Sequence, residues 1–232
     1  PPGRSLGELY LTDGRGRSEF LCEASGVVCV PAGRYLSLSY SFDPVSGLLA
    51  LSKLRGDDLY ALSFSGSDLR DRELEFLSGL TGLRELDLSC TSVTDEGLVY
   101  LERLAGITKL NLASTKITDQ GLACLQAMKS LRELVLDNTL VGDEGMDAVA
   151  SHEDLQILSL SFTQITNKGL AKLRALRRLE SLRLNCTVID DKGLSHVQRL
   201  SGLKELWVRS TGVTYPGLVE LTKWLSDCEI IR

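Results

Sequence analysis

An apolar pattern recurs every 24 residues through most of this chain, and it limits strongly what the chain can fold into. A period of this length is typical of a solenoid, in which each unit forms one coil and the stacked coils share a core. A further unit starts at Leu59 and a degenerate one near Tyr35. Six consecutive units begin with the aligned residues Leu83, Ile107, Leu131, Leu155, Leu179 and Leu203.

Each unit reads L-x-x-L-x-L-x-x-T-x-[IV]-x-D-x-G-L-x-x-L-x-x-L-x-x, and its periodicity changes halfway. Leu86 and Leu88 alternate with polar residues, which predicts a strand with one buried face. Leu98, Leu101 and Leu104 recur at a spacing of three, which predicts one face of a helix. We therefore expect strand and helix to alternate from coil to coil.

Three further positions recur with the same period, and we interpret them as structural. A threonine follows each strand, where its hydroxyl is expected to bond to the backbone of the neighbouring coil. Four residues later an aspartate or asparagine is expected to cap the helix. Two residues after it, a glycine permits tight packing against the neighbouring coil. In the unit that starts at Leu83, these residues are Thr91, Asp95 and Gly97.

This pattern resembles the leucine-rich repeat family, and specifically its cysteine-containing-like subclass with 24-residue units. Similar repeats occur in uncharacterised bacterial leucine-rich repeat proteins and in the repeat domains of F-box substrate receptors. The resemblance implies an α/β fold, a right-handed solenoid or horseshoe with a parallel sheet on the concave face and helices on the convex face. Departures are threonine where relatives often carry Asn or Cys, and Tyr215-Pro216 in place of the last aspartate turn. No F-box precedes the repeats, so a ubiquitin-ligase role does not carry over.

The ends of the chain are expected to cover the exposed edges of the core. We predict a β-rich cap over residues 1–34 and about eight repeats over residues 35–232, the last including the C-terminal cap. Ile230-Ile231 are expected either to close the core or to pair as a terminal strand. The expected local elements are cap strands at 8–11, 19–22 and 27–30, a helix from Asp43-Pro44 to Leu54, and a last helix at 216–224.

Composition restricts the classes of partner and cofactor. The net charge of -5 argues against nucleic acid, and the lack of a long apolar run makes a membrane partner or span unexpected. Six dispersed cysteines and two histidines predict neither a zinc site nor another cofactor, and reduced thiols favour the cytoplasm. The sequence leaves open whether Cys22 and Cys29 form a disulfide. It also leaves open whether an N-terminal targeting segment has been removed.

A partner is expected on the concave strand face, at the outward third, fifth and seventh positions of each unit. Trp207 beside Arg183 and Arg209 is the most interaction-like cluster, although Trp207 could instead pack under the C-terminal tail. A second, cationic patch on the helical side, from Lys168 to Arg199, is either a docking surface or a solvated face. The candidate partner-binding residues are Trp207, Arg209, Arg183, Phe162, Ile157, Val135, Asp137, Lys109, Asp87 and Glu85.

No residue set in the sequence supports catalysis, so we predict that the chain is not an enzyme. His152 occupies an apolar slot of its unit and is interpreted as a partly buried histidine with satisfied hydrogen bonds. The predicted function is a non-catalytic protein-binding module that recognises a macromolecular partner. The alternative is a regulatory or scaffold segment of a larger receptor, kinase or ubiquitin-ligase-type protein; neither the partner nor the oligomeric state can be read from the residues.

Overall fold

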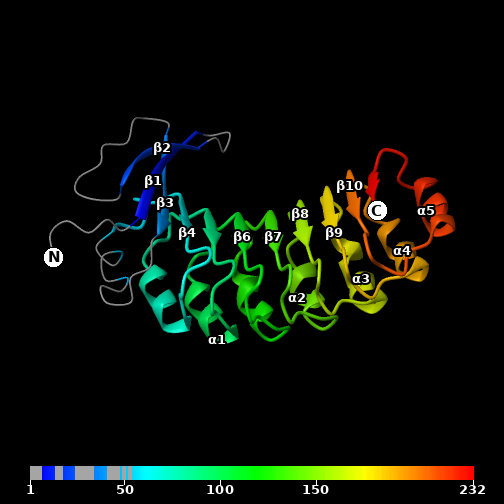
Figure 1. The fold of residues 1–232 in the computed structure, drawn as a ribbon, viewed down its shortest axis with the longest axis horizontal. Helices are drawn as coiled ribbons and strands as arrows, with labels where there is room; N and C mark the ends of the chain where they lie inside the picture. Colours follow the sequence, from blue (N-terminus) through cyan, green and yellow to red (C-terminus); the bar gives the residue numbers. More distant parts are fainter. Residues whose placement is uncertain (1–6, 14–17, 24–33, 41–47, 49–50, 52–53) are drawn as a thin grey trace.

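The computed structural model describes residues 7–13, 18–23, 34–40, 48, 51 and 54–232. Strands stand side by side along the long axis, and helical segments follow one edge of the stack (Figure 1). The strands form one open sheet in the order β11-β10-β9-β8-β7-β6-β5-β4-β3-β1-β2. The predicted solenoid architecture is therefore confirmed. The expected strand at 27–30 and most of the helix expected from Asp43 lie outside the described residues. Cys29, which was considered as a partner for Cys22 in a disulfide, also lies outside them.

The repeats contribute short parallel strands in strict register. Glu85 lies opposite Ala61 on one side and Lys109 on the other, which is a shift of one repeat at each step. The central leucine of each strand points inward, as in Leu86, which is 2% exposed. These strands are β4 (Ala61–Ser63), β5 (Glu85–Asp87), β6 (Lys109–Asn111), β7 (Glu133–Val135), β8 (Ile157–Ser159), β9 (Ser181–Arg183) and β10 (Glu205–Trp207).

Two of the expected cap strands are present, and they extend the repeat sheet. β1 (Gly7–Thr12) pairs antiparallel with β2 (Ser18–Glu23) and with β3 (Tyr35–Tyr40). β3 then pairs parallel with β4, so the cap and the repeats share one continuous sheet. The division of the chain at residue 34 stays a prediction.

The C-terminal end follows one of the two predicted alternatives. The last helix, α5 (Tyr215–Thr222), begins after Thr214, whose hydroxyl accepts a hydrogen bond from the amide of Gly217. β11 (Glu229–Ile231) then pairs parallel with β10, and Ile231 lies beside Trp207. The terminal isoleucines therefore form a strand at the end of the sheet.

The helical side is more irregular than predicted, because many coils carry 3-10 helix. Leu98, Leu101 and Leu104 are fully buried, as expected, but a spacing of three matches the three residues per turn of a 3-10 helix better than an α-helix. The segments before α5 are η2 (Asp71–Leu77), α1 (Asp95–Leu98), η3 (Val99–Leu101), η4 (Gly121–Ala127), α2 (Met146–Ala150), α3 (Asn167–Lys172), η5 (Leu173–Ala175) and α4 (Asp191–Val197).

The recurring threonine bonds within its own coil, so the predicted bond to the neighbouring coil is wrong. The hydroxyl of Thr91 donates to the carbonyl of Leu88 at 2.7 Å, three residues back. Cys90, just before it, has a φ of 56°, and this left-handed residue turns the chain back toward the strand. The same bond recurs at Thr115, Thr139, Thr163, Thr187 and Thr211.

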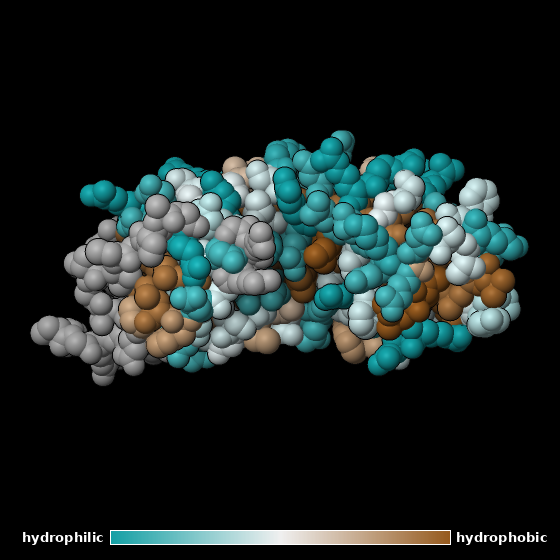
Figure 2. Space-filling view, turned by 90° about the horizontal axis from the view of Figure 1, so that it is seen from above, coloured by the Kyte–Doolittle hydropathy of each residue, from teal (hydrophilic) through white to brown (hydrophobic). Residues whose placement is uncertain are grey.

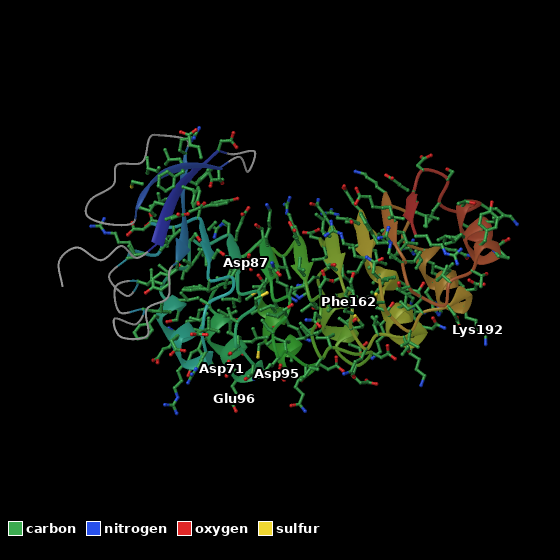
Figure 3. The ribbon with its side chains drawn as sticks, in the orientation of Figure 1. Asp71, Asp87, Asp95, Glu96, Phe162 and Lys192 are labelled. Atoms are coloured by element: carbon green, nitrogen blue, oxygen red, sulfur yellow. The ribbon has the colours of Figure 1, made fainter. Side chains whose placement is uncertain are left out.

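The recurring aspartate is likewise not the cap of its own helix. Thr94 is the cap of α1, since its hydroxyl accepts from the amide of Glu96 at 3.3 Å. Because the cap position is already filled, Asp95 bonds across the stack and accepts from the amide and the hydroxyl of Thr118 on the next coil. Asp71 bonds to Thr94 in the same way, and Figure 3 shows Asp71 and Asp95 along one edge of the stack.

The recurring glycine has the predicted packing role. A Cβ atom on Gly97 would lie 2.5 Å from the Oδ1 atom of Asp71 and 3.2 Å from its Cα atom. A side chain at this position would therefore collide with the carboxylate that joins the two coils. The expectation of a tight contact with the neighbouring coil is confirmed.

Candidate functional site

The strand face consists of the outward third and fifth residues of the units in strands β3 to β11. The predicted inclusion of the seventh position is only partly right, because Ser89 and Ser161 are buried where the chain turns inward after the strand. The third-position row is Ser37, Ala61, Glu85, Lys109, Glu133, Ile157, Ser181, Glu205 and Glu229. The fifth-position row is Ser39, Ser63, Asp87, Asn111, Val135, Ser159, Arg183, Trp207 and Ile231.

The N-terminal half of the strand face is hollowed into a groove of about 540 Å³. Tyr10 and Ser18 of the cap strands line one side, and outward residues of β3 to β7 line the rest. The outward side chains of β3 and β4 are small, as at Ser39 and Ser63, which leaves this part of the sheet uncovered. The groove therefore depends on the cap as well as on the repeats.

Acidic groups predominate in this groove. The ammonium of Lys109 lies 2.9 Å from a carboxylate oxygen of Glu85, and the hydrogen bond to Glu85 raises the pKa of Lys109. One carboxylate oxygen of Asp87 accepts from the amide of Ser89 at 2.9 Å. Within the described part of the chain, neither Asp87 nor Glu133 has an ion-pair partner. The predicted residues Glu85, Asp87 and Lys109 thus share one hollow.

The C-terminal half carries the predicted arginine–tryptophan contact. The guanidinium carbon of Arg183 lies 5.7 Å from the ring centroid of Trp207. The Nε atom of Arg183 and the Nε1 atom of Trp207 are both buried and without a hydrogen-bond partner among the described residues. Trp207 is half-buried between Arg183 and Ile231, so the C-terminal segment lies beside it in the sheet. Arg209 is exposed, and its backbone amide donates to Asn185 at 2.8 Å.

Phe162 is exposed at the end of strand β8 and has an unusual backbone conformation. It is 60% exposed, and its φ of 58° lies in the left-handed region, where bulky residues are rare. The sequence reasoning missed this conformation, although Gly66 and Asn138 in the same slot are the residue types that favour it. The residues of the other coils in this slot are Cys90, Ser114, Asn138, Cys186 and Ser210.

Of the remaining predicted residues, Val135 lines the edge of the groove, and Ile157 and Asp137 lie between it and the Arg183–Trp207 contact. Val135 and Ile157 are half-buried on the adjacent strands β7 and β8. Asp137 accepts hydrogen bonds from the hydroxyl of Ser159 at 2.6 Å and from the amide of Ser161 at 2.7 Å. Asp137 therefore joins neighbouring coils, and its bonding capacity is already used in part.

Comparison with known proteins agrees with this arrangement. A family model described as leucine-rich repeat matches residues 80–101, 107–125 and 152–173. The chain is a leucine-rich repeat solenoid. No curated protein matches its sequence significantly.

Two solved structures of internalins are similar to this solenoid. The crystal structure of internalin C2 (inlC2) from Listeria monocytogenes has 26% sequence identity and a TM-score of 0.68, over 84% of this chain and 80% of that chain. The crystal structure of an internalin (inlF) from the same species has 23% identity and a TM-score of 0.65, over 75% of this chain. The repeat solenoid spans 48% of the inlF chain, so this likeness shows the fold alone.

On the helical side of the repeat solenoid, part of the predicted cationic patch is neutralised. Lys172 lies 2.8 Å from Asp147 and 3.4 Å from Glu144, and Arg178 pairs with Asp154. The other predicted cations of this patch have no ion pair among the described residues. Figure 2 views the stack from above in the orientation of Figure 1, and there hydrophobic patches are interspersed with hydrophilic side chains.

His152 is buried within its repeat, as predicted. It is 2% exposed, and neither ring nitrogen makes a hydrogen bond of normal geometry with the described residues. Burial lowers the pKa of His152 and the nearby charge of Lys129 lowers it further, whereas a weaker interaction with the backbone of Met128 raises it. Met128 and Leu176 fill the same slot in the neighbouring repeats, so the imidazole occupies an apolar position.

Among the described residues, no group of three or more His, Cys, Asp or Glu side chains is arranged to hold a metal ion. None of the described helices has the length and apolar character that crossing a bilayer requires. Cys22, Cys90, Cys124, Cys186 and Cys228 are free thiols.

Proposed function

We propose that this leucine-rich repeat solenoid is a non-catalytic module that binds a protein partner through its strand face. The observation that carries the proposal is the contact between Arg183 and Trp207, at 5.7 Å from guanidinium carbon to ring centroid. Tryptophan and arginine dominate the binding energy of many protein interfaces. Arg183 and Trp207 are both half-buried, so a binding partner would pack against the exposed parts of the guanidinium group and the indole ring.

Further residues of the strand face and of the turns that directly follow its strands fit an interface with an apolar centre and a polar rim. Phe162 offers exposed aromatic surface, and Val135 and Ile157 extend the apolar strip toward the groove. The proposed rim consists of Arg209, Asp137, Lys109, Asp87 and Glu85.

The absence of catalysis is part of the same proposal. An enzyme needs a nucleophile, a base or a metal that converges on a pocket from which water is excluded. The groove of the strand face is lined by carboxylates, serines and one lysine that is held by Glu85 at 2.9 Å. This set contains no nucleophile activated by a neighbouring base, whereas it offers many groups that recognise polar surfaces.

A second candidate is a recognition segment of a larger receptor, kinase or ubiquitin-ligase-type protein. The match to only 48% of the inlF chain fits this alternative, because the similar fold there is part of a longer chain. The cysteine-containing-like subclass, the likeness to bacterial and F-box repeat proteins, the division at residue 34 and a cytoplasmic setting remain part of the proposal. The full length of the gene product distinguishes the two candidates.

Quantitative affinity capture tests the proposed binding face. The variant carries Trp207→Ala, Arg183→Ala and Arg209→Ala, and the matched control carries Lys168→Ala, Lys192→Ala and Arg199→Ala on the helical side. We expect recovery of the partner to fall by about tenfold or more with the strand-face variant and to stay unchanged with the control. Unchanged recovery with the strand-face variant would contradict the proposal.

A further inference from the structure

We infer that the groove beneath the cap strands binds a lysine or arginine side chain of an extended partner segment. The inference rests on the proposed function, since it names the chemistry that one part of the strand face recognises. It concerns the N-terminal half of the face, several strands away from the Arg183–Trp207 contact. The two parts can therefore be tested separately.

The shape of the groove suits one long side chain and the backbone that carries it. Its volume of about 540 Å³ lies within the range of small-ligand pockets. The small residues Ser39, Ala61 and Ser63 form its base, and Tyr10 rises beside it from the cap. The lining extends from Tyr10 and Ser18 of the cap strands to Glu133 and Val135 of β7, which is long enough for one extended side chain.

The charge in the groove selects a cation. Glu85 already holds Lys109, but Asp87 and Glu133 have no ion pair in the described part of the chain. A free carboxylate oxygen of Asp87 remains after the other has accepted the amide of Ser89. A guanidinium or ammonium group would form charge-assisted hydrogen bonds there, while an acidic segment would be repelled by both free carboxylates.

The groove also suits the aliphatic part of a basic side chain. The outward side chains of Ala61 and Val135 give the lining an apolar part. Lysine and arginine bury their methylene stems along such apolar surface while the charged head reaches polar groups. A bare metal ion lacks this fit, and the described residues contain no group of three ligands for one.

Binding of labelled peptides tests the inference. The probes are short glycine–serine peptides that carry two arginines, two glutamates or no charge, and fluorescence anisotropy measures their binding to the whole chain. We expect the arginine peptide to bind about tenfold more tightly than the neutral peptide and to lose affinity at high salt. Equal binding of the arginine and neutral peptides would overturn the inference.

A matched pair of variants separates the groove from general attraction to an acidic protein. Asp87→Asn with Glu133→Gln removes two charges inside the groove, and Glu96→Gln with Glu153→Gln removes two exposed charges elsewhere. Glu96 lies at the helical edge, far from Asp87 in Figure 3. We expect about a tenfold loss of arginine-peptide affinity from the first variant only. An equal loss from both variants would overturn the inference.

Failure of the groove inference can be distinguished from failure of the proposed function. If the Trp207, Arg183 and Arg209 variant abolishes partner capture while the groove variant leaves capture and arginine-peptide binding intact, the groove inference fails and the proposed function stands. If neither variant affects capture and the groove variant also leaves arginine-peptide binding intact, both fail. If the groove variant lowers both peptide binding and capture, the groove and the proposed function are supported together.

Discussion

Asp95 accepts two hydrogen bonds from Thr118 on the next coil, from the backbone amide at 2.8 Å and from the hydroxyl at 2.5 Å. The same pair of bonds joins Asp71 to Thr94 and Asp191 to Thr214. The cohesion of the solenoid therefore depends on polar ties between coils as well as on the leucine core. In Figure 3, Asp71 and Asp95, which form these hydrogen bonds, lie on the helical edge, away from Asp87 of the strand face.

One coil lacks part of this tie and provides an internal comparison. Asp119 faces Gly142 in place of threonine, and it accepts only the amide of Gly142, at 2.7 Å. We predict that Asp95→Ala lowers the free energy of unfolding by about 2–3 kcal/mol and Asp119→Ala by about 1 kcal/mol. Urea denaturation measures both values. A larger loss for Asp119→Ala would contradict the role assigned to the threonine hydroxyl.

Glycine packing at the same edge gives a second prediction. A Cβ atom on Gly97 would meet Asp71 at 2.5 Å, whereas one on Gly79 would have no atom within 4 Å. We predict that Gly97→Ala destabilises the fold by at least about 1–3 kcal/mol through overpacking. Gly79→Ala should be neutral or slightly stabilising, because alanine restricts the unfolded chain. Equal thermal midpoints for the two variants would contradict this prediction, because they would show that Asp71 can move away from the added methyl group without loss of stability.

Buried His152 predicts a dependence of stability on pH. Its pKa is lowered in the folded protein, so the unfolded chain, with a pKa near about 6.5, binds the proton more readily. The contribution of the neutral imidazole to the free energy of unfolding is therefore fully present above about pH 6.5. It is lost as the pH falls from that value through the lower pKa of the folded state. His152→Leu should remove this part of the pH dependence, measured by urea unfolding between about pH 7 and pH 5. An identical acid-induced loss in the variant would assign the effect to other groups.

The conformation of Phe162 predicts a trade between stability and binding. Asn138 adopts the same left-handed conformation, with a φ of 54°, and asparagine tolerates it better than phenylalanine does. We predict that Phe162→Asn raises the free energy of unfolding by about 1 kcal/mol and weakens partner capture. Calorimetry and capture would be measured on the same preparation. A variant that is less stable than the wild type would show that Phe162 contributes to packing.

Much of the fold follows from the 24-residue period, because each set of leucines can be buried only against the next copy of itself. The hydrogen-bond partners of Thr91 and Asp95 could not be predicted in the same way. In a stack with one repeat per coil, each residue lies close to its own coil and to the two adjacent coils. A residue type that recurs with the period does not show which of these coils its side chain bonds to. Only the geometry shows that Thr91 bonds inside its coil and Asp95 across it.

The candidate site was accessible to sequence reasoning only in part. The alternation around Leu206 places Trp207 outward, next to Arg183 one repeat earlier, and the contact between them follows from that register. The groove did not follow, because it needs Tyr10 and Ser18 of the non-repeating cap in position beside the sheet. Nothing in the periodic pattern fixes where these two residues lie.

Site-specific photo-crosslinking tests the central claim that the strand face binds the partner. A benzophenone side chain would replace either Phe162, which is 60% exposed at the end of β8, or Val99, which is 54% exposed on the helical side. The two sites match in exposure and apolar character, so a difference in yield reports position. The account predicts a covalent adduct with the partner from position 162 and none from position 99, whereas an adduct from position 99 alone would contradict it.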